Sequence, residues 1–307
     1  MHPAIALLLG LAAAGLGGEL FIRSAVGIAR AARLTTAIIG VTVAAFATSS
    51  PELSVAVNSA LAGTPEISLG DALGSNVVNV ALILALATLV APIHSGTASL
   101  RRDFPVAIAT APVIAFLAWD GRLSRADGLV MLCIFFVWLT LVVAEGRRVR
   151  RASKPVKNAA SRIAAAGGLA VAGLVLLVAA GRLVVIGAQG IGEALGLAPF
   201  TVGATMVSVG TSIPELATTL AAQLRGQSDI SLGNILGSNI FNAFFIVSVA
   251  AVIRPIAVNW HAVAFGLGFG ILAIVLALPR RAVIGRRRGL LLLGVYVIYL
   301  LTILRVG

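Results

Sequence analysis

Two short segments of the chain carry matched polar residues that could bind a cation. The first reads TSSPE, from Thr48 to Glu52, and the second reads TSIPE, from Thr211 to Glu215. On a helix, the threonine lies four residues and the adjacent serine three residues before the glutamate, so that hydroxyls and carboxylate share one face. The proline removes a backbone donor and frees carbonyl oxygen in the preceding turn. Such oxygens suit a hard cation such as Na⁺ or Ca²⁺.

A second polar motif follows each of these segments. It reads GSNVVN around Ser75 and Asn79, and GSNIFN around Ser238 and Asn242. The serine and the last asparagine of each copy are four residues apart and again share a helix face. The sequence has no cluster of His and Cys that would favour zinc or copper.

The composition indicates that these motifs lie within a membrane. Of the 307 residues, 59% are hydrophobic and 11% are charged, whereas a soluble protein has roughly 45 to 50% and 25%. Because lipid offers no backbone hydrogen-bond partner, the apolar runs are expected to be helices. This composition excludes a cytosolic enzyme and a DNA-binding protein. There are ten such runs, at residues 3–29, 36–62, 67–91, 104–119, 126–145, 163–190, 199–224, 230–253, 258–278 and 289–304.

The two motif glutamates are the most informative residues. An ionised carboxylate near the centre of the bilayer costs several kcal/mol, so it is seldom there without a partner or a function. No basic residue in either copy is close enough along the helix to neutralise Glu52 or Glu215. Two protonated glutamates hydrogen-bonded between helices are the structural alternative. The Ser, Thr and Asn side chains taken singly would as readily bond between helices, but their pairing with glutamates in two copies favours ligation.

The motifs belong to a longer internal repeat. Residues 40–93 align without a gap to residues 203–256, and the polar residues of both motifs are matched at an offset of 163. Each half holds an odd number of spans, so the second half is inverted relative to the first. The predicted fold is an all-α polytopic membrane protein with ten transmembrane helices in two inverted five-helix repeats, broken at the ion site. Residues 1–145 form the first repeat, 146–162 a basic cytoplasmic linker and 163–307 the second repeat.

The distribution of Lys and Arg predicts the orientation. Most of the 23 fall in the connections on one side of this topology and in the linker. The predicted outer connections hold Arg122, Arg125, Arg254 and Arg305. Because positive residues concentrate on the cytoplasmic side, both termini are expected outside, in a multi-pass protein of the cytoplasmic (inner) membrane. The single cysteine, Cys133, is expected to be a buried apolar residue.

The two pairs of motifs resemble the two alpha-repeats of the cation/calcium exchanger superfamily, specifically its prokaryotic sodium/calcium exchanger family. The first pair is ATSSPEL with GDALGSNVVN, and the second is GTSIPEL with GNILGSNIFN. The resemblance implies ten helices, four ion sites clustered at mid-membrane, and alternating access by sliding of the first and sixth helices over the others. The ligands that it implies are the Ala45 carbonyl, Thr48, Ser49, Glu52, Ser75, Asn79, Ser208, Thr211, Ser212, Glu215, Ser238 and Asn242.

The chain departs from the family pattern at two positions. Ala47 stands where the motif usually has Gly, and Asn242 stands where several exchangers carry Asp. The site therefore has two carboxylates instead of three, which leaves the coupling ratio and the driving ion open. A further acid, Asp71, aligns with Asn234. It is expected near a membrane face as a solvated or capping carboxylate, and ion recruitment is the alternative.

Na⁺/Ca²⁺ antiport that extrudes Ca²⁺ is the leading functional hypothesis. An H⁺/Ca²⁺ antiporter is the alternative, because two carboxylates close together in low dielectric repel each other and a proton could replace a sodium ion. A cation channel would share the oxygen-rich site but would not couple two flows. An intramembrane hydrolase would need a nucleophile with a base. We therefore expect no enzyme activity and no cofactor; the partners are the transported cations and membrane lipid, without nucleic acid, and the oligomeric state is open.

Overall fold

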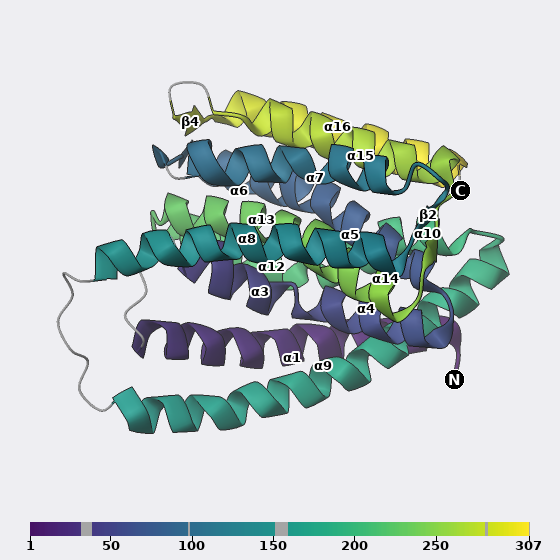
Figure 1. The fold of residues 1–307 in the computed structure, drawn as a ribbon, viewed down its shortest axis with the longest axis horizontal. Coiled ribbons are helices and arrows are strands. Elements are labelled where there is room, and N and C mark those ends of the chain that lie inside the picture. The colour runs from purple at the N-terminus through teal and green to yellow at the C-terminus, as the bar shows by residue number, and fades with distance from the viewer. Residues whose placement is uncertain (32–38, 98, 151–158, 280–281, 307) are drawn as a thin grey trace.

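The protein folds into a bundle of helices that run along a common direction (Figure 1). The computed structural model describes residues 1–31, 39–97, 99–150, 159–279 and 282–306. Both termini lie at the same end of the bundle (Figure 1). Of the predicted linker 146–162, residues 151–158 lie outside the described residues, and the remainder belongs to the ends of two long helices.

Short π-helical segments, here named η, interrupt the α-helices next to the repeated motifs. In the first half the elements are α1 (Pro3–Ala31), η1 (Ile39–Ala44), α3 (Ala45–Thr48), α4 (Ser50–Ala62), α5 (Pro65–Val77), η2 (Val78–Leu84), α6 (Ala85–Val90), β1 (Ile93–His94), η3 (Ser99–Asp103), α7 (Phe104–Leu117), β2 (Arg122–Leu123) and α8 (Arg125–Arg150). In the second half they are α9 (Ala159–Leu195), α10 (Pro199–Val202), η4 (Gly203–Val207), α11 (Ser208–Thr211), α12 (Ile213–Leu224), α13 (Ser228–Phe241), η5 (Asn242–Ile246), α14 (Val247–Ile253), β3 (Ile256–Ala257), α15 (Trp260–Ala277), β4 (Val283–Ile284) and α16 (Arg286–Val306).

The chain is a multi-pass membrane protein. Within the described residues, seven helices are long and apolar enough to cross a bilayer. The sequence predicts ten. The difference has a physical cause: α7 has 14 residues, and the predicted runs 36–62 and 199–224 are each divided near a proline into shorter helices.

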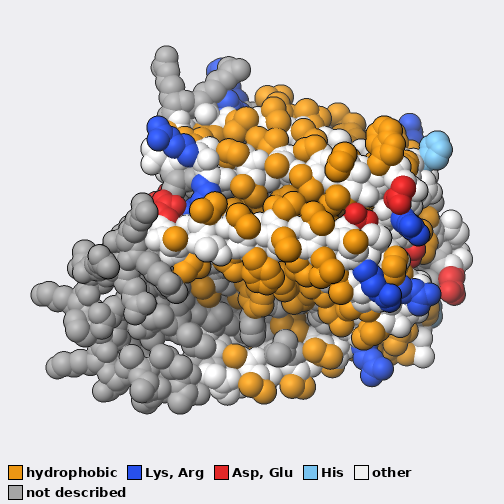
Figure 2. Space-filling view, in the orientation of Figure 1, with side chains coloured by type: hydrophobic (Ala, Val, Ile, Leu, Met, Phe, Trp, Pro, Cys, Tyr) orange, Lys and Arg blue, Asp and Glu red, His pale blue; other side chains and the backbone are white. Residues whose placement is uncertain are grey.

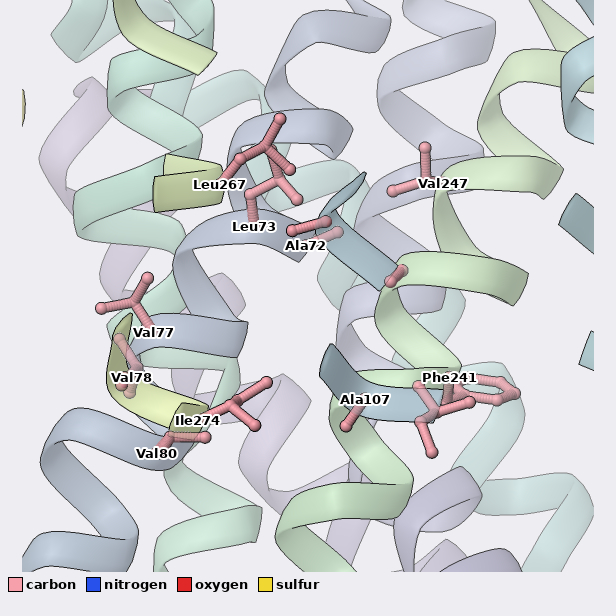
Figure 3. Packing of buried hydrophobic residues seen from close by; sticks show 14 of the residues in the cluster. Ala72, Leu73, Val77, Val78, Val80, Ala107, Phe241, Val247, Leu267 and Ile274 are labelled. Atoms are coloured by element: carbon pink, nitrogen blue, oxygen red, sulfur yellow. The ribbon is translucent and has the colours of Figure 1, made fainter. Parts of the chain in front are cut away.

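The two helices that carry the GSNxxN motifs lie at the centre of the bundle. In the apolar 18-residue window of the span Pro65–Val90, 78% of the residues are buried, and in that of Ser228–Ile253, 83%. The corresponding windows of α8 and α16 are 28% buried. Figure 3 shows Leu73 of α5 packed near Leu267 of α15 in the buried apolar cluster. The central helices therefore offer a site shielded from both lipid and water.

The outer surface of the bundle is apolar over its middle. In Figure 2, hydrophobic side chains cover the middle of the visible face, and charged side chains gather toward its two ends. Large exposed side chains include Phe116 and Val137. Because a soluble protein would not expose such a band, lipid contact is its explanation. Cys133 of α8 lies on this exposed surface, so its predicted burial within the protein is wrong.

Two small antiparallel sheets join the halves of the chain. Strand β1 pairs with β4, and β2 pairs with β3, so each sheet contains one strand from each half. The first sheet lies at one end of the bundle, near β4, and the second lies at the opposite end, near β2 (Figure 1). Helices α1 and α9, the first of each half, pack side by side on one flank (Figure 1).

Glycines allow the repeated segments to approach backbone to backbone. A Cβ built on Gly70 of α5 would lie 2.0 Å from the Phe200 carbonyl oxygen, and one on Gly203 of η4 would lie 2.3 Å from the carbonyl of Ile67. Larger side chains at these positions would hold α5 and η4 apart. The close contact brings α5, with its polar motif, against the helix break of the other half.

Candidate cation-binding site

Two interrupted helices form the centre of the candidate site. Helix α3 gives way to α4 at Ser49 (φ −83°, ψ 13°), and α11 gives way to α12 at Ser212 (φ −80°, ψ 5°). The motif proline lies in the first turn of the second helix, where its missing N–H is not needed. Glu52 and Glu215 also lie in this first turn, where the positive end of the helix dipole favours a negative charge.

Every predicted site residue is buried, with no more than 1% of its surface exposed. They come from corresponding elements of the two halves: α3, α4, α5 and η2 in the first, and α11, α12, α13 and η5 in the second. Asn79 lies in η2, and Asn242 begins η5. Such π-helical turns are rare and frequently accompany functional sites; the sequence pattern does not predict them here.

Glu215 is held by hydroxyls from both halves. Ser49 Oγ donates to Glu215 Oε1 at 2.9 Å, and Ser238 Oγ donates to the same oxygen at 3.3 Å. Thr48 Oγ1 lies 3.4 Å from Ser238 Oγ and 3.3 Å from Asn234 Oδ1. The structure therefore joins residues that are about half the chain apart in sequence into one polar cluster.

Asp71 is part of the same interior and not of a membrane face. Its side chain is 1% exposed. Thr211 Oγ1 donates to Asp71 Oδ1 at 3.1 Å, and Ser75 Oγ donates to it at 3.4 Å. The expectation of a solvated or capping carboxylate is wrong because α5 is enclosed by other helices. One sequence signal does place Asp71 with the site residues. Asp71, Ser75 and Asn79 are spaced four residues apart and therefore share one helix face.

Residues 163 positions apart make matching contacts. Thr48 of the first half donates to Asn234 of the second, and Thr211 of the second half donates to Asp71 of the first, the residue equivalent to Asn234. At the junction between the halves, Asn76 Nδ2 donates to the Asn239 carbonyl at 3.2 Å, and Asn239 Nδ2 donates to the Asn76 carbonyl at 3.1 Å. This reciprocity is what a two-fold relation between the GSN motifs requires.

The buried carboxylates of Glu52, Glu215 and Asp71 differ in the number of hydrogen bonds that they accept. Within the described residues neither oxygen of Glu52 has a hydrogen-bond partner, and no ion pair reaches Glu52, Glu215 or Asp71. Buried polar groups are normally paired, and buried charges more so. Other buried oxygens without a partner among the described residues include Glu215 Oε2, Asp71 Oδ2, Ser212 Oγ, Asn79 Oδ1 and Asn242 Oδ1.

Two backbone carbonyls of the predicted site keep helical partners. The Ala45 carbonyl accepts the Ser49 amide at 3.0 Å and the Thr48 hydroxyl at 3.2 Å. The Ser208 carbonyl accepts the Ser212 amide at 3.2 Å. Proline 51 removes only the bond to the carbonyl four residues earlier, which is that of Ala47. The proline therefore does not free the Ala45 carbonyl.

The chemistry of this buried cluster suits hard cations. All of its side-chain groups offer oxygen, the donor that Na⁺ and Ca²⁺ prefer. Within the described part of the chain no three His, Cys, Asp or Glu side chains are placed to hold one metal ion. Each cation would therefore use one or two carboxylates and complete its shell with hydroxyl and amide oxygens.

Comparisons with known proteins agree with this geometry. A family model described as sodium/calcium exchanger protein matches residues 2–144 and 165–305, one match in each half. The chain is 33% identical over 277 residues to inner membrane protein YrbG of Escherichia coli, covering 86% of this chain and 85% of the relative. It is 31% identical to the putative antiporter CaxA of Alkalimonas amylolytica, covering 96% of both chains.

A solved structure extends the similarity to the fold. The sodium-calcium exchanger NCX_Mj, from crystals soaked with Na⁺ and Sr²⁺, superposes with a TM-score of 0.72 at 29% identity, and the match covers 98% of each chain. A third relative, sodium/calcium exchanger MaX1 of Methanosarcina acetivorans, is 28% identical over 82% of this chain and 83% of its own length. With the family model spanning most of both halves, the chain belongs to the sodium/calcium exchanger protein family.

Proposed function

We propose that the protein is a secondary antiporter that extrudes Ca²⁺ in exchange for Na⁺ by alternating access. One observation carries the proposal: two buried glutamates at helix breaks, with no basic residue paired to them in the described structure. Burying such charges costs several kcal/mol unless a cation compensates them. If Ca²⁺ and Na⁺ compensate the same carboxylates in turn, they compete, and competition couples their flows. NCX_Mj and MaX1 are named as sodium/calcium exchangers, which supports the same pair of ions.

The proposed ligands are the twelve residues that the sequence predicts. Ca²⁺ takes about six to eight oxygens, of which Glu52 and Glu215 would supply up to four and would cancel its double charge. The unpartnered oxygens of Ser212, Asn79 and Asn242 are available to complete the shell. The hydroxyls of Thr48, Ser49, Ser75, Ser208, Thr211 and Ser238 and the Ala45 carbonyl are the remaining members; these now bond within the protein and would reorient toward an ion.

The proposed framework consists of ten membrane helices in two inverted five-helix repeats, residues 1–145 and 163–307, joined by a linker at 146–162. The matched contacts at the 163-residue offset support it, and so do the two sheets at opposite ends of the bundle, each with one strand from each half. In this arrangement α1 and α9, packed side by side at the flank, are the pair that slides over the other helices.

We further propose that both termini face outward from the cytoplasmic membrane. Both lie at one end of the bundle (Figure 1). The described cations of the opposite end include Arg286, which donates to the Val90 carbonyl beside β1, and Arg102, which pairs with Glu145 near the end of α8. An excess of positive residues marks the cytoplasmic side. The relative YrbG is named as an inner membrane protein.

Uptake of ⁴⁵Ca²⁺ into proteoliposomes, with each candidate driving ion supplied alone, tests the function. Vesicles loaded with Na⁺ should accumulate Ca²⁺ from a Na⁺-free medium, whereas vesicles with only a pH gradient should not. Accumulation driven by the pH gradient alone would instead identify an H⁺/Ca²⁺ antiporter. Ca²⁺ entry at the same rate with no counter-ion on the inside would identify a channel and contradict the proposal.

Asn242→Asp should change ion selection more than it changes folding. Asn242 is fully buried, and neither its Oδ1 nor its Nδ2 has a partner among the described residues, so the substitution breaks no hydrogen bond. An added carboxylate favours divalent over monovalent cations because attraction scales with ion charge. We expect the Na⁺ concentration that halves Ca²⁺ binding to rise about tenfold, equal to about 1.4 kcal/mol. Identical competition curves for variant and parent would remove Asn242 from the ligand set.

A further inference from the structure

We infer that Asp71 is a third cation-binding carboxylate of this site, and that it forms a subsite for a monovalent hard cation such as Na⁺ with the hydroxyls of Thr211 and Ser75. The inference rests on the proposed antiport and deepens it, because it names the side chain that holds an additional driving ion.

Among the described residues, only one of the two carboxylate oxygens of Asp71 accepts hydrogen bonds. Oδ1 accepts the Thr211 hydroxyl at 3.1 Å, from the other half of the chain, and the Ser75 hydroxyl at 3.4 Å. Oδ2 is buried without a hydrogen-bond partner, and no salt bridge in the described structure includes Asp71. A carboxylate in this position lacks compensation for its charge. A cation bound at Oδ2 would supply it.

The equivalent residue in the second half, Asn234, has all of its side-chain polar atoms hydrogen-bonded within the protein. Asn234 accepts the Thr48 hydroxyl at Oδ1 (3.3 Å) and donates from Nδ2 to the Thr219 hydroxyl (3.2 Å). Both ends of the amide are therefore satisfied. At the offset of 163, the counterpart of Thr219 is Ala56, which has no polar side chain. The first half thus has a charged group where the second has a neutral one, and lacks the matching hydroxyl.

The serine of the first GSN motif is turned toward Asp71. In the second half, Ser238 donates to the motif glutamate, Glu215, at 3.3 Å. In the first half, Ser75 donates to Asp71, and both oxygens of Glu52 are left without a partner. Asn79, one turn further along the same helix face, also has a buried Oδ1 without a partner. Carboxylate, hydroxyl and amide oxygens therefore line this side of the site.

The subsite is separate from the position shared by the two glutamates. No three acidic side chains in the described structure are placed to hold one metal ion, so Asp71 does not join both glutamates on a single cation. With Asn79 and Asn242 neutral, the site has three carboxylates. One Ca²⁺ compensates two of these charges, whereas three monovalent cations compensate all three. Two glutamates balance the charge of two Na⁺ ions, and the third carboxylate therefore allows a third Na⁺ ion to bind.

Counting the Na⁺ ions bound by purified protein tests the inference without any transport step. We expect Asp71→Asn, which introduces the residue found at the equivalent position, to bind one ²²Na⁺ fewer per molecule at saturation in equilibrium dialysis. The matched control is Asp120→Asn. Asp120 is exposed at an end of the bundle, and its loss should leave the number of bound Na⁺ ions at the parent value.

Equal Na⁺ saturation in Asp71→Asn and the parent would overturn the inference. If Asp71→Asn does not fold, as judged by its melting in detergent, Asp71→Glu decides. It keeps the charge and should bind the parent number of Na⁺ ions with an altered affinity for one of them, and unchanged affinity for every Na⁺ ion would overturn the inference. The number of bound Na⁺ ions is measured at equilibrium and does not depend on transport. A parent protein that binds Na⁺ but does not exchange Ca²⁺ would contradict the proposed antiport, and the number of Na⁺ ions bound by Asp71→Asn would still decide the inference about Asp71.

Discussion

Glu52→Gln and Glu215→Gln should each abolish Na⁺-driven Ca²⁺ uptake while leaving the protein inserted and folded. Glutamine has nearly the same shape as glutamate, and both side chains are fully buried, so packing is preserved. Each change removes one of the charges that compensate the double charge of Ca²⁺. In a membrane interior this is worth about 3 kcal/mol, or about a hundredfold in affinity. Initial rates of ⁴⁵Ca²⁺ uptake at subsaturating Ca²⁺ should therefore fall by about that factor.

The structure predicts a difference between these two variants. Glu215 accepts the hydroxyls of Ser49 and Ser238, whereas Glu52 has no partner among the described residues. Glutamine keeps a carbonyl oxygen that can accept both hydroxyls, but a neutral amide oxygen is a weaker acceptor than a carboxylate. We therefore expect Glu215→Gln to lower the melting temperature more than Glu52→Gln. Glu193→Gln, at an exposed glutamate near the end of α9, is the matched control and should transport at the parent rate. Near-parent exchange by either site variant would refute the two-glutamate site.

Gly70→Ala should strongly destabilise the protein and impair exchange. The added Cβ would lie 2.0 Å from the Phe200 carbonyl oxygen and 2.9 Å from the Ala204 nitrogen. Both are backbone atoms, so α5 and the helix opposite must separate. Overpacking of this kind costs about 1 to 3 kcal/mol and occasionally more. Because α5 carries Asp71 and Ser75 and leads into η2 with Asn79, the same displacement would also move these side chains away from those of the other half.

A second glycine provides the control for this substitution. A Cβ on Gly268 of α15 would meet no atom within 4 Å, and alanine is favoured over glycine within a helix by about 1 kcal/mol. Gly268→Ala should melt in detergent at or slightly above the temperature of the parent, and Gly70→Ala several degrees below it. Equal melting temperatures for the two variants would show that the close approach of α5 to η4 does not hold the bundle together.

Much of the site follows from local spacing in the sequence. The residues of the T-S-x-P-E and G-S-N-x-x-N motifs repeat at a fixed offset, and helical periodicity places each set on one face. Their burial in the structure agrees with this. The proline also predicts an interruption, which lies at Ser49 and Ser212. These features depend only on near neighbours in the chain, which is why a single sequence reveals them.

The position of Asp71 depends on distant parts of the chain. It lies inside the bundle because α5 packs against η4 and α11 of the other half, with Thr211 as its partner. Nothing in the residues beside it separates a membrane-face carboxylate from a buried one. The π-helical turns at Asn79 and Asn242 likewise have no signal in the residues beside them. The apolar pattern predicts ten spans, but it does not give the lengths of the pieces into which the two proline-containing runs are divided.

The most direct test of the antiport is simultaneous measurement of both ion flows in one vesicle preparation. Proteoliposomes loaded with ²²Na⁺ and placed in a medium with ⁴⁵Ca²⁺ should lose Na⁺ as they gain Ca²⁺, in a fixed ratio that does not change with the Ca²⁺ concentration. Removing external Ca²⁺ should stop Na⁺ efflux, and replacing internal Na⁺ with choline should stop Ca²⁺ entry. Either flow continuing at an unchanged rate after removal of the other ion would contradict a shared site.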